Sequence, residues 1–190
     1  MNILVNRVMR AALLDKEFYK EAEADTSLNQ EALLVVIIVS IAAGIGTLVG
    51  RLFGGEIGAA ILALIVSTAV GIANYFIWAY VTHFIGTNMF KGEAEPGELL
   101  RVLGYASGPR ILSLLVFIPY LGGILSLGGS IWALVAGFFG VQEALDLDIT
   151  ETLVTVVLGW VVVFIISAII TSLLGFGALG LGSALSVFGR

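Results

Sequence analysis

The stretch TLVTVVLGWVVVFIISAIITSLL, residues 152–174, decides the class of this protein. It contains no charged side chain over 23 residues. An α-helix rises about 1.5 Å per residue, so the stretch is long enough to cross a bilayer core about 30 Å thick. The sequence therefore predicts an integral membrane protein with a transmembrane helix here.

The composition of the whole chain agrees with this class. Hydrophobic residues make up 59% of the 190 residues, charged residues make up 12%, and the mean hydropathy is +1.08. Soluble domains are about 45–50% apolar and about 25% charged, so a soluble fold could not bury this much apolar surface. The chain has no cysteine, which excludes disulfides and thiolate chemistry. Its net charge of -5 and its lack of a basic cluster argue against nucleic-acid binding.

Four further apolar segments precede residues 152–174, and together they predict an all-α bundle of five transmembrane helices over residues 32–175. The second segment would measure about 43 Å as a helix, so it must tilt or protrude. Its Tyr75, Trp78 and Tyr80 suggest an aromatic belt at the membrane surface. Residues 176–190 read as a glycine-rich apolar tail. The five predicted spans are residues 32–49, 57–85, 99–118, 121–141 and 152–174.

The third and fourth spans can also be divided in another way. Residues 111–141 could form one long broken helix, with residues 98–108 as an interfacial helix, and the chain would then have four spans. Pro119 followed by Gly122 and Gly123 is typical of a turn, which favours five spans.

Residues 1–31 are polar and mixed in charge. Their apolar side chains gather on one side of a helical wheel, which predicts an imperfect amphipathic helix on the membrane surface, although Leu13 and Leu14 interrupt the pattern. A solvated helix at the cytoplasmic surface is the alternative. Ser27 and Gln30 have the spacing of a capping box before the first span, and Asp148 and Glu151 have the same relation to the fifth.

The distribution of lysine and arginine predicts the orientation. With five spans and a cytoplasmic N-terminus, six basic residues fall inside and two, Arg51 and Arg190, fall outside. This bias favours an N-in, C-out topology. The six inside residues are Arg7, Arg10, Lys16, Lys20, Lys91 and Arg101.

Glycine recurs at every fourth position at the first predicted turn, at Gly46, Gly50, Gly54 and Gly58. In a membrane helix this spacing leaves a groove in which another backbone can approach closely. We expect packing within the chain, with a dimerisation face as the alternative.

Arg110 is the most unusual residue of the apolar region. If the third helix begins near Glu98, Arg110 lies about 18 Å along it. Ionisable groups at that depth are costly, and they usually pair or face a cavity. Glu56 is the expected partner, and Asn74 is a further polar residue within a span; a structural role, a lipid contact and a proton or anion pathway all stay open for Arg110.

The sequence contains no motif that predicts catalysis, a cofactor or a metal. The nucleophile elbow, the phosphate-binding glycine loop, HExxH and paired intramembrane carboxylates are all absent. The single histidine, His83, is expected to make a hydrogen bond near the inner surface and not to bind a ligand. We therefore expect a protein that is not an enzyme.

The segment ELLRVLGYASGP at residues 98–109, with Gly104, Tyr105 and Pro109, resembles the GY…P helix of the Yip (Ypt-interacting protein) domain family. A proline turn at Pro119 and a tryptophan-containing helix at residues 129–132 continue the resemblance. The resemblance implies a five-helix membrane domain with a cytoplasmic N-terminus. Eukaryotic members act in vesicle traffic and bind prenylated Rab-type GTPases. This chain lacks their long N-terminal region and DLYGP element, and it is more similar to short prokaryotic members, so Rab-type binding is not transferred.

Two functions follow as hypotheses. The first is a membrane scaffold or adaptor that binds other membrane proteins, itself or lipid, and we expect it in a prokaryotic cytoplasmic membrane. The second is a small permease or channel with a polar path near Arg110 and Asn74.

Overall fold

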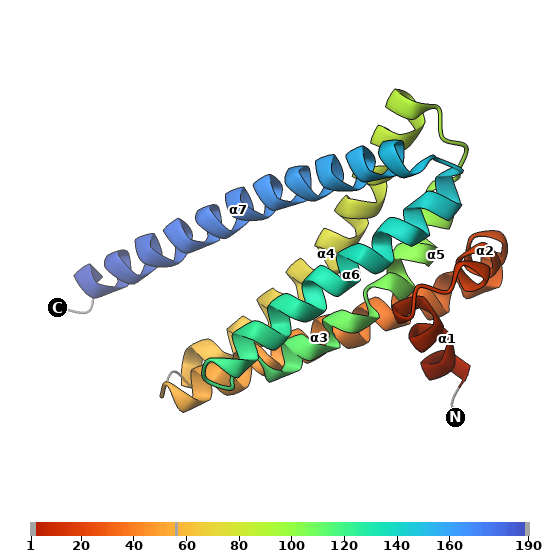
Figure 1. Cartoon of the computed structure of the whole chain (residues 1–190). Helices are drawn as coiled ribbons and strands as arrows, with labels where there is room; N and C mark the ends of the chain where they lie inside the picture. Colours follow the sequence, from red (N-terminus) through yellow and green to blue (C-terminus); the bar gives the residue numbers. More distant parts are fainter. Residues whose placement is uncertain (1–2, 56, 189–190) are drawn as a thin grey trace.

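The structure is a computed structural model, and it describes residues 3–55 and 57–188, with side chains in the last helix through residue 170 and at residue 172. Four long apolar helices dominate it (Figure 1). These are α3 (Asn29–Phe53), α4 (Ile57–Phe90), α6 (Leu121–Leu145) and α7 (Ile149–Phe188). Within the described residues, these four regions are long and apolar enough to cross a membrane. The protein is thus an all-helical integral membrane protein.

The predicted third span is not one continuous helix. An α-helix, α5 (Pro96–Ala106), is followed by a 3₁₀-helix, η2 (Gly108–Leu115). Pro109 explains the break, because proline has no N–H to donate and disfavours α-helical geometry in the residue before it. The amide of Arg110 donates to the carbonyl of Ser107 at 3.0 Å, which is a 3₁₀ hydrogen bond. The prediction of a single helix over residues 99–118 is corrected to these two elements.

The α5–η2 segment nevertheless runs lengthwise through the bundle. Its α-helical and 3₁₀ parts together rise about 32 Å. It packs against α3 and α6 on either side, and α4 and α7 complete the bundle (Figure 1). The chain therefore runs in alternating directions through α3, α4, α5–η2, α6 and α7.

The N-terminal region folds into two short helices instead of one. These are α1 (Ile3–Ala12) and α2 (Lys16–Ala24), followed by the 3₁₀-helix η1 (Thr26–Leu28). The break falls at Leu13 and Leu14, where Leu14 has a φ of 63°, and Asp15 caps α2 by accepting from the amide of Phe18 at 3.2 Å. The single interfacial helix of the prediction is thus corrected. Both helices pack against α5.

The helix ends agree with the sequence at one position and differ at another. Asp148 and Glu151 accept from each other's amides at 2.8 and 3.3 Å, so the capping box before the last helix is confirmed. The capping box at Ser27 is wrong. Asp25 instead accepts from the Ser27 amide and caps η1, and α3 begins without a side-chain cap. α7 stays helical to Phe188, through most of the predicted tail.

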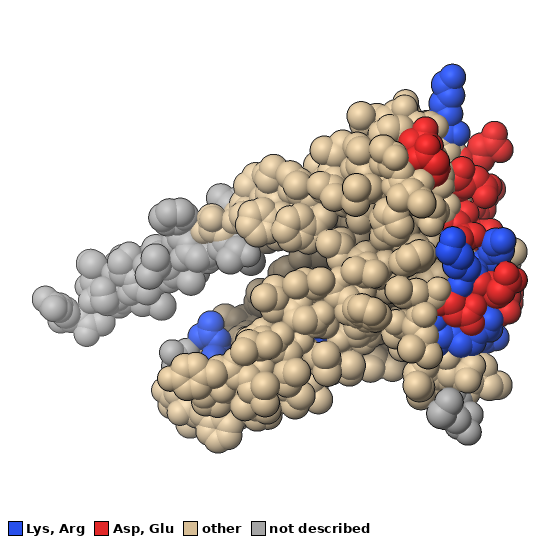
Figure 2. Space-filling view, viewed as in Figure 1, with Lys and Arg blue, Asp and Glu red and all other residues tan. Residues whose placement is uncertain are grey.

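Acidic side chains gather at one end of the molecule (Figure 2). We call this the charged end, formed by α2, by residues 91–98 and by residues 143–151. The best-packed part of the core lies directly beneath it: Phe18, Tyr19, Leu99, Leu103 and Leu145 are fully buried. Away from this end, large apolar side chains such as Ile61, Ile65 and Phe164 are exposed, as expected of a surface that faces lipid.

Candidate functional site

The two residues of the GY pair hold α5 against α3. A Cβ on Gly104 would lie 2.9 Å from both the Cβ and the carbonyl oxygen of Ala32, so only glycine allows this close contact. The buried Tyr105 donates its hydroxyl to Glu31 Oε1 at 2.8 Å, and Arg7 bonds the other carboxylate oxygen at 2.7 Å. Tyr105 therefore links α5, the start of α3 and α1.

Arg101 fixes the N-terminal helices to the bundle. It is 4% exposed, and its guanidinium donates to the carbonyl of Ala22 at 2.6 Å, to the carbonyl of Glu23, and to the Asn29 side chain at 3.1 Å. The two carbonyls belong to the last turn of α2, where helix carbonyls lack partners within the helix. Arg101 was predicted only as a cytoplasmic charge, so its structural role was missed.

Ion pairs reinforce this arrangement at the surface. Arg10 binds Asp15 at 2.6 Å and Glu21 at 2.9 Å, which holds the turn between α1 and α2. These two carboxylates raise the pKa of Arg10, and Arg10 lowers the pKa of Asp15. Lys16 and Lys20 both approach Glu143 of α6, at 3.6 and 4.0 Å.

Glu23 is the perturbed acid of the charged end. Its Oε2 is buried and has no hydrogen-bond partner among the described residues. Burial, together with the negative charges of Asp146, Glu98 and Glu143, raises the pKa of Glu23 from 4.5 to about 7. This carboxyl therefore titrates near neutral pH.

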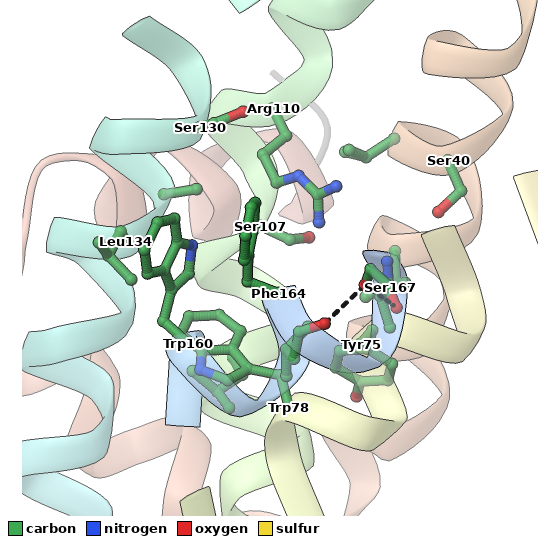
Figure 3. Close-up of a pocket in the computed structure, with 16 residues that line it drawn as sticks. Ser40, Tyr75, Trp78, Ser107, Arg110, Ser130, Leu134, Trp160, Phe164 and Ser167 are labelled. Atoms are coloured by element: carbon green, nitrogen blue, oxygen red, sulfur yellow. Dashed lines mark hydrogen bonds between the residues drawn. The ribbon is translucent and has the colours of Figure 1, made fainter. Parts of the chain in front are cut away.

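A cavity of about 250 Å³ lies deeper in the bundle, where the membrane helices meet (Figure 3). Arg110 lies at its wall, with its guanidinium directed into the cavity. Among the described residues, that guanidinium makes no hydrogen bond or ion pair. Ser167 donates to Asn74 Oδ1 at 3.0 Å across the same cavity. The lining residues used below come from α3, α4, α6 and α7: Ser40, Asn74, Tyr75, Trp78, Ser130, Leu134, Trp160, Phe164 and Ser167.

Two of the three aromatics expected at the membrane surface face this cavity instead. Tyr75 is 5% exposed and donates to the carbonyl of Leu100 at 2.6 Å, and Trp78 lines the cavity beside it. Tyr80 is 52% exposed. The aromatic-belt prediction is thus wrong for Tyr75 and Trp78, because the packing of the helices turns both rings into the bundle.

The remaining predicted residues are separated in the fold. The predicted partner Glu56 lies outside the described residues, so its pairing with Arg110 stays a prediction. Ile57, the first residue of α4, lies about 25 Å along the helix from Asn74 in the cavity wall. His83 meets the carbonyl of Ala94 at 2.9 Å, in agreement with the expected hydrogen bond. Pro119 accepts from the amide of Leu121 at 2.7 Å in the turn before α6.

The four glycines at every fourth position have different surroundings. A Cβ on Gly46 would lie 2.5 Å from the carbonyl oxygen of Ser113, so Gly46 packs directly on the η2 backbone. Gly50 faces Phe117 at 3.7 Å. A Cβ on Gly54 would lie 3.4 Å from the carbonyl oxygen of Arg51 in the same helix, and one on Gly58 would meet nothing within 4 Å. Packing within the chain accounts for glycine at Gly46, whereas a Cβ on Gly50 would make only an ordinary contact, and a dimerisation face stays a prediction.

Comparison with protein families decides the relationship. The family model of the Yip1 domain matches residues 12–189. The chain belongs to the Yip1 domain family. The matched residues include the GY pair, Pro109, Pro119 and the four long helices of this Yip1-domain protein. Comparisons with curated proteins and with solved structures find no match.

Proposed function

We propose that this Yip1-domain protein is a non-enzymatic membrane adaptor that binds other membrane proteins at its charged end. The observation that carries the proposal is the docking of α2 by Arg101. Three hydrogen bonds from one buried guanidinium hold a polar helix pair in place on the membrane helices. A surface that is fixed before binding loses less conformational entropy when a partner binds.

The charge of this surface supports a basic partner segment. Asp and Glu outnumber Lys and Arg across α2, residues 91–98 and residues 143–151. Glu17 and Glu21 are exposed on α2, and Asp146 and Asp148 are exposed beside the start of α7. Such a surface attracts cationic segments and repels acidic ones.

We infer that the chain crosses the membrane five times, with the charged end in the cytoplasm. The lengthwise course of α5–η2 supports the count. The six basic residues that the sequence assigns to the inside support the orientation, and three of them, Lys16, Lys20 and Lys91, belong to the charged end. The chain resembles short prokaryotic members of the family, which implies that it lies in the cytoplasmic membrane.

Single cysteines can test this topology, because the chain has none of its own. Cysteine at Lys91, Tyr120 or Asp148 should react with an impermeant maleimide in intact cells only at Tyr120, which is 94% exposed in the turn before α6. In inverted vesicles, Lys91→Cys and Asp148→Cys should react and Tyr120→Cys should not. Labelling of all three from the same side would rule out a crossing by α5–η2.

Site-specific photo-crosslinking in native membranes tests the adaptor role. A photoreactive residue at Glu17 should form discrete adducts with membrane proteins, identified by mass spectrometry, whereas the same residue at Tyr120 should not. Arg101→Gln should abolish the Glu17 adducts without preventing insertion, because it releases α2. A protein that stays monomeric and forms no adduct from Glu17 would contradict the proposal.

The cavity around Arg110 supports a permease or channel as the second candidate. It places one cation and Asn74 within the bundle, as a polar path requires. Flux of small anions or protons into proteoliposomes should then depend on Arg110, with Arg51→Ala as the matched loss of one cation. A flux that Arg110→Ala abolishes and Arg51→Ala preserves would replace the adaptor by a permease.

A further inference from the structure

The cavity beside Arg110 has the chemistry of an anion site. Arg110 comes from the α5–η2 segment, and its guanidinium points toward the side of the cavity where Ser40 and Ser167 lie (Figure 3). The described residues that line the cavity include no Asp or Glu. One cation without an acid in its surroundings favours a negatively charged ligand.

The cation itself is held in an unfavourable state. Arg110 is only partly exposed, and atoms of the protein surround it on most sides. Its described contacts include a backbone hydrogen bond to Ser107 but none from the guanidinium. A charge partly removed from water without a partner is destabilising, and a bound anion would offset part of that cost.

A second donor without a partner belongs to a side chain whose ring lines the same cavity. Trp78 Nε1 is buried and has no hydrogen-bond acceptor among the described residues. The other polar groups are largely used within the protein: Tyr75 bonds Leu100, Ser107 bonds Gly104, and Ser167 bonds Asn74. Trp78 Nε1 lies beside Gly159 of α7, so the Arg110 guanidinium is the unpartnered donor that an anionic oxygen in the cavity can bind.

The open side of the cavity is apolar and faces the bilayer. Trp160 and Phe164 of α7 line it and are 51% and 61% exposed, and their rings stack with centroids 5.8 Å apart. Ser130 of α6, on the opposite wall, is also exposed. Figure 2 shows the molecule hollowed between α7 and the other helices. A ligand can therefore enter sideways from the membrane.

We propose that this cavity binds one anionic phospholipid, with its phosphate on Arg110 and its acyl chains between α6 and α7. At about 250 Å³ the cavity is smaller than pockets for drug-sized ligands, so it holds a headgroup while the chains stay at the Trp160 and Phe164 surface. The guanidinium can bind two phosphate oxygens at once. This site is independent of the charged end, so its failure would leave the adaptor proposal untouched.

Native mass spectrometry of the purified full chain with phosphatidylglycerol tests the proposal. The wild type should retain one tightly bound lipid, and Arg110→Gln should weaken retention about tenfold or more, equivalent to at least 1.4 kcal/mol. Arg110→Lys should retain part of the binding, because the positive charge remains. It should not retain all of it, because lysine cannot make the bidentate contact of a guanidinium with phosphate. Arg51→Gln, which removes one cation elsewhere, should bind like the wild type.

Two ligand controls separate the parts of the lipid. Diacylglycerol has the chains without the phosphate, and glycerol phosphate has the phosphate without the chains. Both should bind at least about tenfold more weakly than phosphatidylglycerol if headgroup and chains both contribute. Equal retention of diacylglycerol would show an apolar groove only, and equal binding of glycerol phosphate would show a site for free phosphate; either result overturns the proposal.

Two further variants keep the test decisive if Arg110 variants fold poorly. Ser130→Phe narrows the lateral opening on the exposed side of α6 while leaving Arg110 in place, and it should reduce retention. Glu56→Gln should leave retention unchanged. A sharp rise in retention for Glu56→Gln would mean that Glu56 already neutralises Arg110, and equal losses for Arg51→Gln and Arg110→Gln would mean general attraction of lipid to charge; both would overturn the proposal.

Discussion

Arg101 and Arg110 lie nine residues apart on the α5–η2 segment, yet their surroundings differ completely. Arg101 is buried beneath the charged end, and every described hydrogen bond of its guanidinium goes to a protein oxygen. Arg110 faces a cavity, and its guanidinium has no described protein partner. The fold supplies hydrogen-bond acceptors for the guanidinium of Arg101, whereas the guanidinium of Arg110 stays available to a ligand. The same side chain can thus stabilise a structure at one depth and cost stability at another.

Removal of Arg101 should have the largest effect on the fold. Arg101→Gln leaves the carbonyls of Ala22 and Glu23 without their buried donor, so we expect a loss of about 3–5 kcal/mol in the free energy of unfolding. Hydrogen exchange should rise throughout α2 while α4 and α6 stay protected. Lys91→Gln, an exposed change of the same charge, should leave exchange unaltered. Continued protection of α2 in Arg101→Gln would show that its apolar contacts alone hold it.

Tyr105→Phe removes one hydroxyl from the link between α5 and Glu31. Because the acceptor is a carboxylate, we expect a loss of about 1.5–2 kcal/mol in unfolding free energy. Arg7 still pairs with Glu31, so the remaining network should limit the damage. Denaturant titration in detergent can measure the change, with Tyr80→Phe as the exposed control. An effect no larger than that of Tyr80→Phe would show that the hydrogen bond from Tyr105 to Glu31 does not stabilise the fold.

Glu23 makes the stability of the charged end depend on pH. Its pKa is about 7 in the folded protein, against 4.5 for the free side chain, so the folded state binds more protons between these values. Stability should therefore fall as pH rises from about 4.5 to 7, by about 1 kcal/mol after allowance for solvent screening. Glu23→Gln should remove this slope, and the exposed Glu93→Gln should keep it. A slope that is unchanged in Glu23→Gln would assign the titration to another group.

The long apolar runs predicted most of the fold, because a span is a local property of the sequence. α3, α4, α6 and α7 contain four of the five predicted spans, and Asp148 marked the start of the last helix correctly. Pro109 was read as part of a helix that it breaks. The docking of α1 and α2 was missed, because the carbonyls that Arg101 binds carry no signal in the sequence.

The candidate site was predicted only in part. Arg110 and Asn74 stood out as polar residues in apolar runs, and both line the cavity. Tyr75 and Trp78 were assigned to the membrane surface, since aromatic rings with polar tips suit both an interface and a polar cavity. Which of the two applies depends on the helix packing, which is a property of the whole bundle.

Arg110 should have the smallest effect on stability in the absence of lipid. Its guanidinium has no described protein partner to lose, so Arg110→Gln should change the unfolding free energy by less than about 0.5 kcal/mol or raise it slightly. Pairing with Glu56 predicts the opposite: Arg110→Leu and Glu56→Leu should each destabilise the protein, and the double change should recover much of the loss.

The most direct test compares Arg101→Gln and Arg110→Gln by thermal unfolding, side by side in the same lipid-free detergent. We expect a midpoint lowered by many degrees for Arg101→Gln and a midpoint equal to or slightly above that of the wild type for Arg110→Gln. Equal losses in the two variants, or a larger loss for Arg110→Gln, would contradict the claim that the fold satisfies one arginine and leaves the other for a ligand.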